Sequence, residues 1–309
     1  MIVKHAPVII FSYNRPNHLR QTLDALAKNT LASQSVLYIY CDGSKENASE
    51  EQVTKVQENR RVAHAAIGFA EINVIERETN IGLAANIVGA VTEILNQYGR
   101  VITLEDDVIT SPGFLRYMND ALEMYKDDEQ VMHISSYTWP HRGKLPDTFF
   151  YEVPYPGGGW ATWQRAWKHY TDDVEPLYDY WSTRWDEFNK FGGNYLQSQL
   201  EKNYHGVMKT WFIKWHAVML QRGALTLYPG QSLTNNIGFD DQGTNCYITD
   251  KFDVVPVDSI EVKRRPIKEN KRAAREIYAF YQGRWYNRRR RTQMINKILS
   301  FLHLPTIKL

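Results

Sequence analysis

The sequence predicts an α/β fold in which a mostly parallel central sheet is flanked by helices. Short apolar runs alternate, in the first half of the chain, with longer segments whose apolar residues recur at helical spacing. This alternation is typical of βαβ units, because two parallel strands need a crossover connection that is usually a helix. Polar turns follow each run, and a chain of 309 residues can bury the core of such a sheet.

Four strands are predicted in the first part of the chain, from short segments rich in apolar residues, at 8–11, 36–40, 71–76 and 101–104. Helices are predicted between them, at 17–28, at 49–65 and from the turn at 80–86 to about residue 98. In the first helix Leu19, Leu23 and Leu26 share one face, as an amphipathic helix requires.

The pattern changes in the second half of the chain. A helix at 114–125 and a strand at 131–135 precede a loop-rich stretch at 140–156. The stretch 157–163, which opens with three glycines, is then predicted to enter a helix. Glycine lets the backbone come close either to a ligand or to another segment, and both interpretations stay open.

Two further helices are predicted at 181–191 and 209–222, followed by a strand at 225–228. The second of these helices carries a one-sided apolar stripe, which indicates core more than a platform for sugars: Trp211, Trp215, Val218 and Met219. The polar, glycine-punctuated stretch 232–245 predicts a mobile loop over a site.

Three carboxylates follow the fourth strand directly: Glu105, Asp106 and Asp107. Adjacent acids at the end of an apolar strand repel one another and lose hydration, unless a cation or hydrogen-bond donors offset the cost. Strand geometry predicts that Glu105 and Asp107 face one side and Asp106 the other. Hard oxygen ligands in this position suit Mg²⁺ or Mn²⁺ holding a diphosphate. The alternative is a solvated acidic turn.

Other polar residues also fall just after predicted strands. Arg15, Asp42 and Asn80 follow the first, second and third strands, as Asp107 follows the fourth. In open α/β sheets, ligands bind in the crevice beyond the carboxyl ends of the strands. We therefore expect these four side chains to converge on one crevice.

Composition places the chain among ordinary globular proteins, with 43% hydrophobic and 23% charged residues. Only Cys41 and Cys246 are present, so no disulfide framework is indicated and a reducing compartment is expected. The first apolar run is too short to span a membrane and lacks a cleavage signal, so it predicts a first strand and a cytoplasmic protein.

The net charge of +2 is distributed unevenly along the chain. Residues 261–309 hold 14 Lys and Arg against 3 Asp and Glu, a balance of +11, which leaves −9 for residues 1–260. The four arginines at 288–291 precede apolar residues at helical spacing. This basic amphipathic helix predicts peripheral contact with the anionic inner face of a membrane. A solvated helix end is the alternative, and no nucleic acid is expected as a partner.

Several motifs occur in a fixed order: SYNRP, CDGS, NIGLAAN and LEDDV, and then GGGWATW and YPGQSLTNNIGFDDQGTN. The first four together resemble the nucleotide-sugar half of a GT-A-fold (Rossmann-like) glycosyltransferase. The last two resemble bacterial sugar transferases related to the N-acetylglucosaminyltransferase I family. The resemblance spans residues 6–246. It implies a nucleotide-sugar-binding half at 1–135, an acceptor-side half with a lid loop at 136–260 and a basic helical tail at 261–309.

The resemblance also implies roles for the residues after the strands. Asp107 would hold the divalent metal, Mn²⁺ or Mg²⁺, that bridges the donor diphosphate. Glu105 and Asp106 would contact the ribose and the donor sugar. Asp42 would accept a hydrogen bond from the uracil edge. Arg15 would lie where the first loop meets the nucleotide, with Asn80 in the same crevice.

On the acceptor side, the resemblance implies that Gly158, Gly159 and Trp160 form the floor, and that residues 237–244 form the lid. Here the chain departs from the family pattern. Relatives place an acid, which would serve as the catalytic base, in the helix that corresponds to residues 208–215, and this chain has none there. Asp240 or Asp241 could substitute as the base, although acids that stabilise a turn explain both equally well.

The expected function is therefore metal-dependent transfer of a sugar from a UDP-sugar to a saccharide or lipid-linked saccharide acceptor. The resemblance further implies inversion at the anomeric carbon and a role in surface polysaccharide biosynthesis. A non-catalytic nucleotide-sugar-binding homologue is one alternative, because the base is missing. A sugar-nucleotide pyrophosphorylase is another, although the first loop, FSYNRPNHLR, lacks the glycine-rich triphosphate loop of that class.

Overall fold

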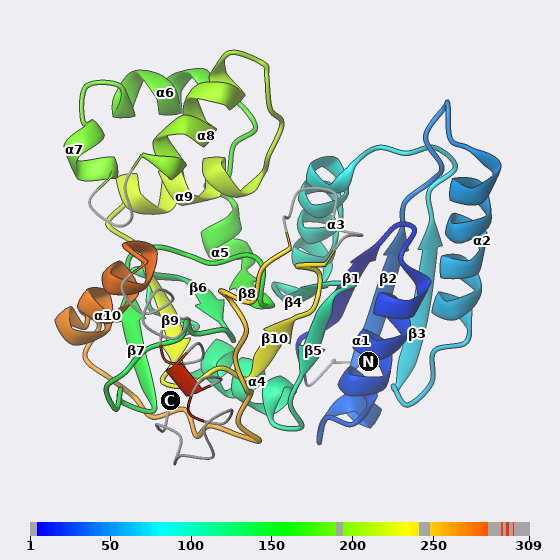
Figure 1. The fold of residues 1–309 in the computed structure, drawn as a ribbon, viewed down its shortest axis with the longest axis horizontal. Coiled ribbons are helices and arrows are strands. Elements are labelled where there is room, and N and C mark those ends of the chain that lie inside the picture. The colour runs from blue at the N-terminus through cyan, green and yellow to red at the C-terminus, as the bar shows by residue number, and fades with distance from the viewer. Residues whose placement is uncertain are drawn as a thin grey trace.

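The computed structural model describes residues 5–189, 194–240 and 248–283, together with Thr292, Ile295, Asn296 and Leu299. One eight-stranded sheet runs through these residues in the order β3-β2-β1-β4-β8-β6-β9-β7, with helices on both of its faces (Figure 1). No helix in this described part combines the length and the apolar character needed to cross a bilayer.

The elements predicted for the first part of the chain are confirmed within one or two residues. They are β1 (Val8–Ser12), α1 (Pro16–Ala27), β2 (Val36–Cys41), α2 (Glu50–His64), β3 (Glu71–Glu76), α3 (Leu83–Tyr98) and β4 (Arg100–Glu105), with a short 3₁₀ turn at Ala32–Gln34. Local signals explain this accuracy. Ser49 and Gln52 form a capping box at the start of α2, and Gly99 ends α3 in the left-handed conformation, at a φ of 74°.

The pairing of the strands confirms the predicted mostly parallel sheet. β1 lies parallel to β2 and β4, and β2 lies parallel to β3. Further along, β6 (Val131–Ser135) lies parallel to β9 (Leu225–Pro229). Only β8 (Trp160–Trp163) and β7 (Thr148–Tyr151) run against their neighbours in this sheet. The proposed boundary at residue 135 thus falls within one continuous sheet.

The core forms two layers because side chains alternate along each strand. Ile9 and Phe11 of β1 belong to a cluster with the inner face of α3, whereas Val8 and Ile10 belong to a second cluster with α1 and α4 (Phe114–Met124). Both clusters are continuous across the sheet. They hold the carboxyl ends of β1, β2 and β4 in fixed positions.

In the second half the strand β8 was not predicted and one predicted helix is wrong. The stretch 157–163 does enter a helix, α5 (Gln164–Trp167), but its last four residues form β8, which pairs with β4 on one side and β6 on the other. The single helix at 181–191 is wrong. Trp181 ends α6 (Glu175–Trp181), whose first turn contains a proline, and a separate turn, α7, covers Trp185–Phe188.

The remaining elements complete the acceptor-side part. α8 (Tyr195–Tyr204) and α9 (Phe212–Gln221) pack with α6 and α7 into a group of helices beside the sheet (Figure 1), and α10 (Lys271–Tyr281) lies against β7. The predicted apolar stripe of α9 is buried, as a core interpretation requires: Trp211, Trp215, Val218 and Met219. Of the predicted basic tail beyond residue 283, only Thr292, Ile295, Asn296 and Leu299 are described.

Part of the predicted mobile loop is a strand. β10 (Thr234–Asn236) pairs antiparallel with β5 (Val108–Thr110), the strand that directly follows the three acids. Residues 241–247, which include Asp241, lie outside the described residues. The pairing brings the start of this loop against the acidic motif.

Candidate active site

A cavity of about 260 Å³ opens at the carboxyl ends of β1, β2 and β4. Its lining includes all four residues that were predicted to converge there, Arg15, Asp42, Asn80 and Asp107. The other two acids of the motif, Glu105 and Asp106, line it as well. The convergence follows from the parallel arrangement of the strands, which places the loops after β1, β2 and β4 side by side. The loop after β3 contributes Asn80 and Gly82.

Arg15 holds the acidic motif together. It is the N-cap residue of α1, and its guanidinium forms one ion pair with Asp106 and another with Asp107, the second at 2.8 Å between Nη2 and Oδ2. The expectation that Asp106 faces away from Asp107 is wrong. β4 ends at Glu105, so Asp106 and Asp107 lie in a turn where the alternation of a strand no longer applies.

The three carboxylates carry more negative charge than one guanidinium neutralises. Burial and the nearby Asp107 raise the pKa of Glu105 to about 8. Burial, only partly opposed by Arg15, raises the pKa of Asp106 to about 6. Burial lowers the pKa of Arg15, but the attraction of Asp106 and Asp107 more than offsets this, and the pKa rises above its usual value. The site therefore favours an additional cation.

The donor set fits a hard divalent cation. Mg²⁺ and Mn²⁺ prefer carboxylate oxygen, and in phosphate sites one or two protein carboxylates suffice, because water and substrate phosphates supply the other ligands. Within the described residues, no group of three or more His, Cys, Asp or Glu side chains is arranged to hold a metal by protein ligands alone. Asp107 and Glu105 would hold such an ion together with a phosphate-bearing ligand.

Asp42 and Asn80 join the loops that follow β2 and β3. The carboxylate of Asp42 accepts from the backbone N–H groups of Gly43, Ile81 and Gly82, each at 3.0 Å. The amide of Asn80 donates to the carbonyl oxygen of Gly43 at 2.9 Å. Both residues line the cavity and also fix its wall.

The glycine turn before β8 is explained by packing. A Cβ on Gly158 would lie 2.3 Å from Cβ of Tyr137, and Gly159 has a φ of +86°, where a Cβ would lie 2.7 Å from Leu104. Trp160 is buried, with its ring stacked on Trp211 at 5.0 Å between centroids. Neither these two glycines nor Trp160 lines the cavity. An acceptor role for them stays a prediction.

Asp240 contacts a histidine of α1. The Oδ2 atom of Asp240 is 3.0 Å from Nε2 of His18, which is buried on α1. His18 also lies close enough to Asp106 to oppose the rise in the pKa of Asp106 that burial causes. Asp240 is not among the residues that line the cavity, and its role as a base stays a prediction.

Sequence reasoning missed three polar residues here. Lys45 lines the cavity, His18 contacts Asp240, and Asn236 donates to Oδ1 of Asp107 at 3.1 Å. Asn236 belongs to the three-residue strand β10, which is too short for periodicity to reveal. His18 lies on a helix face that the leucine pattern had already assigned to the core.

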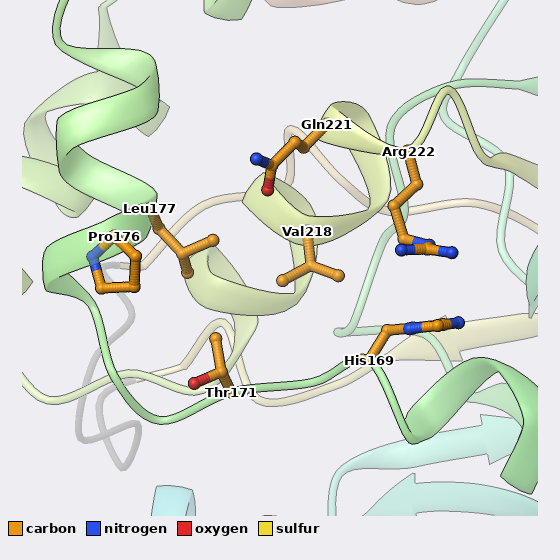
Figure 2. A pocket seen from close by; sticks show the side chains of 7 residues that line it. All are labelled: His169, Thr171, Pro176, Leu177, Val218, Gln221 and Arg222. Carbon is orange, nitrogen blue, oxygen red and sulfur yellow. The ribbon is translucent and has the colours of Figure 1, made fainter.

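A larger cleft, of about 580 Å³, lies elsewhere (Figure 2). Its lining comes from the segment after α5, from α6 and from the end of α9, with His169 and Arg222 at one side and Leu177 and Val218 opposite Thr171. The last residue of β8, Trp163, pairs with the first residue of β4, Arg100, and α5 begins directly after Trp163. The acidic motif lies at the other end of β4. The cleft is therefore at the opposite edge of the sheet from the acidic motif, and it contains no acid.

Comparisons with known proteins agree on one family. The family model for the GNT-I family matches residues 2–192. The chain is 22% identical over 218 residues to an alpha-1,3-mannosyl-glycoprotein 2-beta-N-acetylglucosaminyltransferase of Arabidopsis thaliana, covering 65% of this chain and 46% of the relative. The chain thus spans about half the length of the curated relative that it matches.

Solved structures show weaker similarity. Residues 1–349 of S. aureus TarS superpose with a TM-score of 0.40 at 13% identity, over 76% of this chain and 60% of the other. The galactosyltransferase LgtC, in complex with donor and acceptor sugar analogs, gives a TM-score of 0.37 at 12% identity, over 71% and 72%. Because both TM-scores are low, the fold class follows from the chain's own sheet topology and not from these superpositions.

Proposed function

Because this chain belongs to the GNT-I family, we propose that it is a glycosyltransferase that moves a sugar from a nucleotide-sugar donor to a saccharide acceptor. One observation carries the proposal. Glu105, Asp106 and Asp107 line a cavity at the carboxyl ends of parallel strands, where Arg15 forms ion pairs with the last two of them. Such an acidic crevice repels a bare diphosphate but binds one that arrives with a divalent cation.

We propose a UDP-sugar as the donor and Mn²⁺ or Mg²⁺ as the cation. Bound at Asp107, with Glu105 beside it, the cation would supply charge neutralisation for the leaving diphosphate. The Arg15 guanidinium adds a fixed positive charge at the same edge. Asp42 and Asn80 shape the wall on the side of β2, where we place the nucleotide.

The proposed reaction is a single displacement that inverts the anomeric carbon. An acceptor hydroxyl oxygen forms the new bond to that carbon, the bond to the diphosphate oxygen breaks, and a base takes the hydroxyl proton. α9 and the segment before it supply no acid for this step, so Asp240 and Asp241 are the candidate bases. We place the product among surface saccharides, on the resemblance of the motifs to bacterial sugar transferases.

The test is donor turnover. Purified protein is incubated with a panel of UDP-sugars and saccharide acceptors, with Mn²⁺ or with EDTA, and UDP release is followed. We expect slow release without acceptor, faster release with acceptor, and neither in EDTA. The variant Asp107→Ala should lose metal-dependent donor binding measured by calorimetry. Unchanged donor affinity in that variant would contradict the assignment of Asp107.

A non-catalytic nucleotide-sugar-binding protein is the second candidate, favoured by the missing acid near Trp211 and by the engagement of Asp240 with His18. Tight, metal-dependent donor binding without turnover across the acceptor panel would select it. Formation of a nucleoside triphosphate from the donor and pyrophosphate would instead indicate a pyrophosphorylase.

A further inference from the structure

The side chain of Asn236 joins three segments at the edge of the cavity. Its Nδ2 donates to Oδ1 of Asp107 at 3.1 Å and to the carbonyl oxygen of Gly157 at 2.8 Å. Its Oδ1 accepts from the backbone N–H of Gly238 at 2.8 Å. Both amide hydrogens and the amide oxygen are therefore used. One side chain thus links the acidic motif, the glycine turn and the loop after β10.

The residues that follow Asn236 pass closely over Asp107. The backbone N–H of Ile237 donates to the carbonyl oxygen of Asp107 at 2.8 Å. A Cβ placed on Gly238 would lie 2.0 Å from Oδ2 of Asp107, which leaves no room for a side chain there. The carboxylate is thus fixed on both oxygens, by Asn236 at Oδ1 and by Arg15 at Oδ2.

We propose that Asn236 is a positioning residue, which sets the orientation in which Asp107 presents its carboxylate to a divalent cation. The inference depends on the proposed function, since it assumes that Asp107 binds that cation. Each carboxylate oxygen has two lone pairs, so one hydrogen bond per oxygen leaves a second lone pair for a metal. Partners of metal ligands orient them, and their loss typically costs about 10- to 100-fold in metal affinity or activity.

The chain offers a matched control in the next residue. Asn235 lies in the same three-residue strand and is partly buried like Asn236, but its Oδ1 accepts from the backbone N–H of Val254 at 3.1 Å and does not contact Asp107. A role limited to stabilising β10 predicts similar effects for the two asparagines. A positioning role predicts an effect on the metal for Asn236 alone.

The experiment compares Asn236→Ala, the near-isosteric Asn236→Leu and Asn235→Ala with the parent protein. Mn²⁺ binding is measured by calorimetry with UDP present, because its phosphates supply the remaining ligands, and folding is checked by thermal denaturation. We expect both Asn236 variants to bind Mn²⁺ about 10- to 100-fold more weakly. Asn235→Ala should match the parent. In turnover assays of the Asn236 variants, the Mn²⁺ concentration that gives the half-maximal rate and the KM for the donor should both rise. The KM for the acceptor should be unchanged.

The outcomes separate the two claims. If Asp107→Ala loses Mn²⁺ binding while folded Asn236→Leu retains it, the positioning role is wrong and the proposed function stands. Equal losses in the Asn235 and Asn236 variants would also overturn the positioning role, because they indicate damage to β10. If Asp107→Ala binds Mn²⁺ like the parent, the metal assignment fails, and the inference fails with it.

Discussion

The guanidinium of Arg15 and the carboxylate of Asp107 lie 2.8 Å apart, and the same guanidinium also pairs with Asp106. One partly buried cation therefore connects the loop after β1 with the turn after β4. Thr22 of α1 adds to this connection by donating to the carbonyl oxygen of Asp106 at 2.7 Å. In the absence of a metal, Arg15 provides the main compensation for the charge of the acidic motif.

Replacing Arg15 with glutamine should destabilise the metal-free protein. The substitution leaves buried carboxylates without their cation, and the loss of one partner of a buried ion pair typically costs about 3 kcal/mol or more. We expect urea denaturation in EDTA to show a loss of this size, and Mn²⁺ to restore more stability to the variant than it adds to the parent. Arg20→Gln is the control, because Arg20 is exposed, donates to Asn17 at 3.4 Å and is not among the residues that line the cavity. Equal losses with and without Mn²⁺ would count against a shared site.

The parts of the site that the sequence revealed are those that depend on local signals. Asp42, Asn80 and the acids after β4 each follow a segment that the sequence pattern identified as a strand, and the parallel sheet brings such positions together without further information. Asn236 could not be found in this way. Its importance comes from the pairing of β10 with β5, two segments far apart in the sequence, and no local pattern encodes that contact.

The same reasoning explains the errors in the fold. Trp160–Trp163 is a strand because β4 and β6 supply backbone partners on both sides, whereas the sequence alone showed only a stretch that leads into the following helix, α5. Tertiary pairing overrides local preference in such short segments. The break at 182–184 was missed because the large apolar residues on its two sides, Trp181, Trp185 and Phe188, recur at helical spacing.

Gly238→Ala should impair metal binding in a folded protein. The new Cβ would lie 2.0 Å from Oδ2 of Asp107 and 3.0 Å from Nη1 of Arg15, so the carboxylate must move. We expect Mn²⁺ affinity to fall by about tenfold or more. Gly89→Ala is the control, since an added Cβ there meets nothing within 4 Å on helix α3 and should stabilise by up to about 1 kcal/mol. Normal Mn²⁺ affinity in Gly238→Ala would show that the loop moves aside easily.

Asp42→Asn distinguishes a structural from a ligand-binding role. An asparagine cannot accept from the N–H groups of Ile81 and Gly82 with both of its terminal atoms, because one is now a donor. We expect a stability loss of about 1–3 kcal/mol in urea denaturation, with or without donor. Asp24→Asn, an exposed position on α1, should have no effect. A loss of UDP affinity at unchanged stability would instead support direct contact between Asp42 and the uracil of the donor.

His216 should make the protein less stable in mild acid. It is fully buried on α9 against Phe188, both ring nitrogens lack hydrogen-bond partners among the described residues, and burial lowers its pKa to about 3. Above pH 6.5 the histidine is neutral in both the folded and the unfolded state. Below that pH only the unfolded state binds the proton, so the free energy of unfolding falls by about 1.4 kcal/mol per pH unit.

The variant His216→Phe should remove this contribution. Its ring keeps the contacts with Phe188 and Phe212 and cannot take up a proton, so we expect it to exceed the parent by about 2 kcal/mol at pH 5, with a smaller difference at pH 7.5. Urea denaturation between these pH values measures the difference. Buried His133, whose pKa is also lowered to about 3 by burial, should leave a residual slope in the variant. The control is the exposed position His205, where His205→Gln should behave like the parent. If the free energy of unfolding of His216→Phe falls with decreasing pH as steeply as that of the parent, His216 gains solvent or a partner before the protein unfolds.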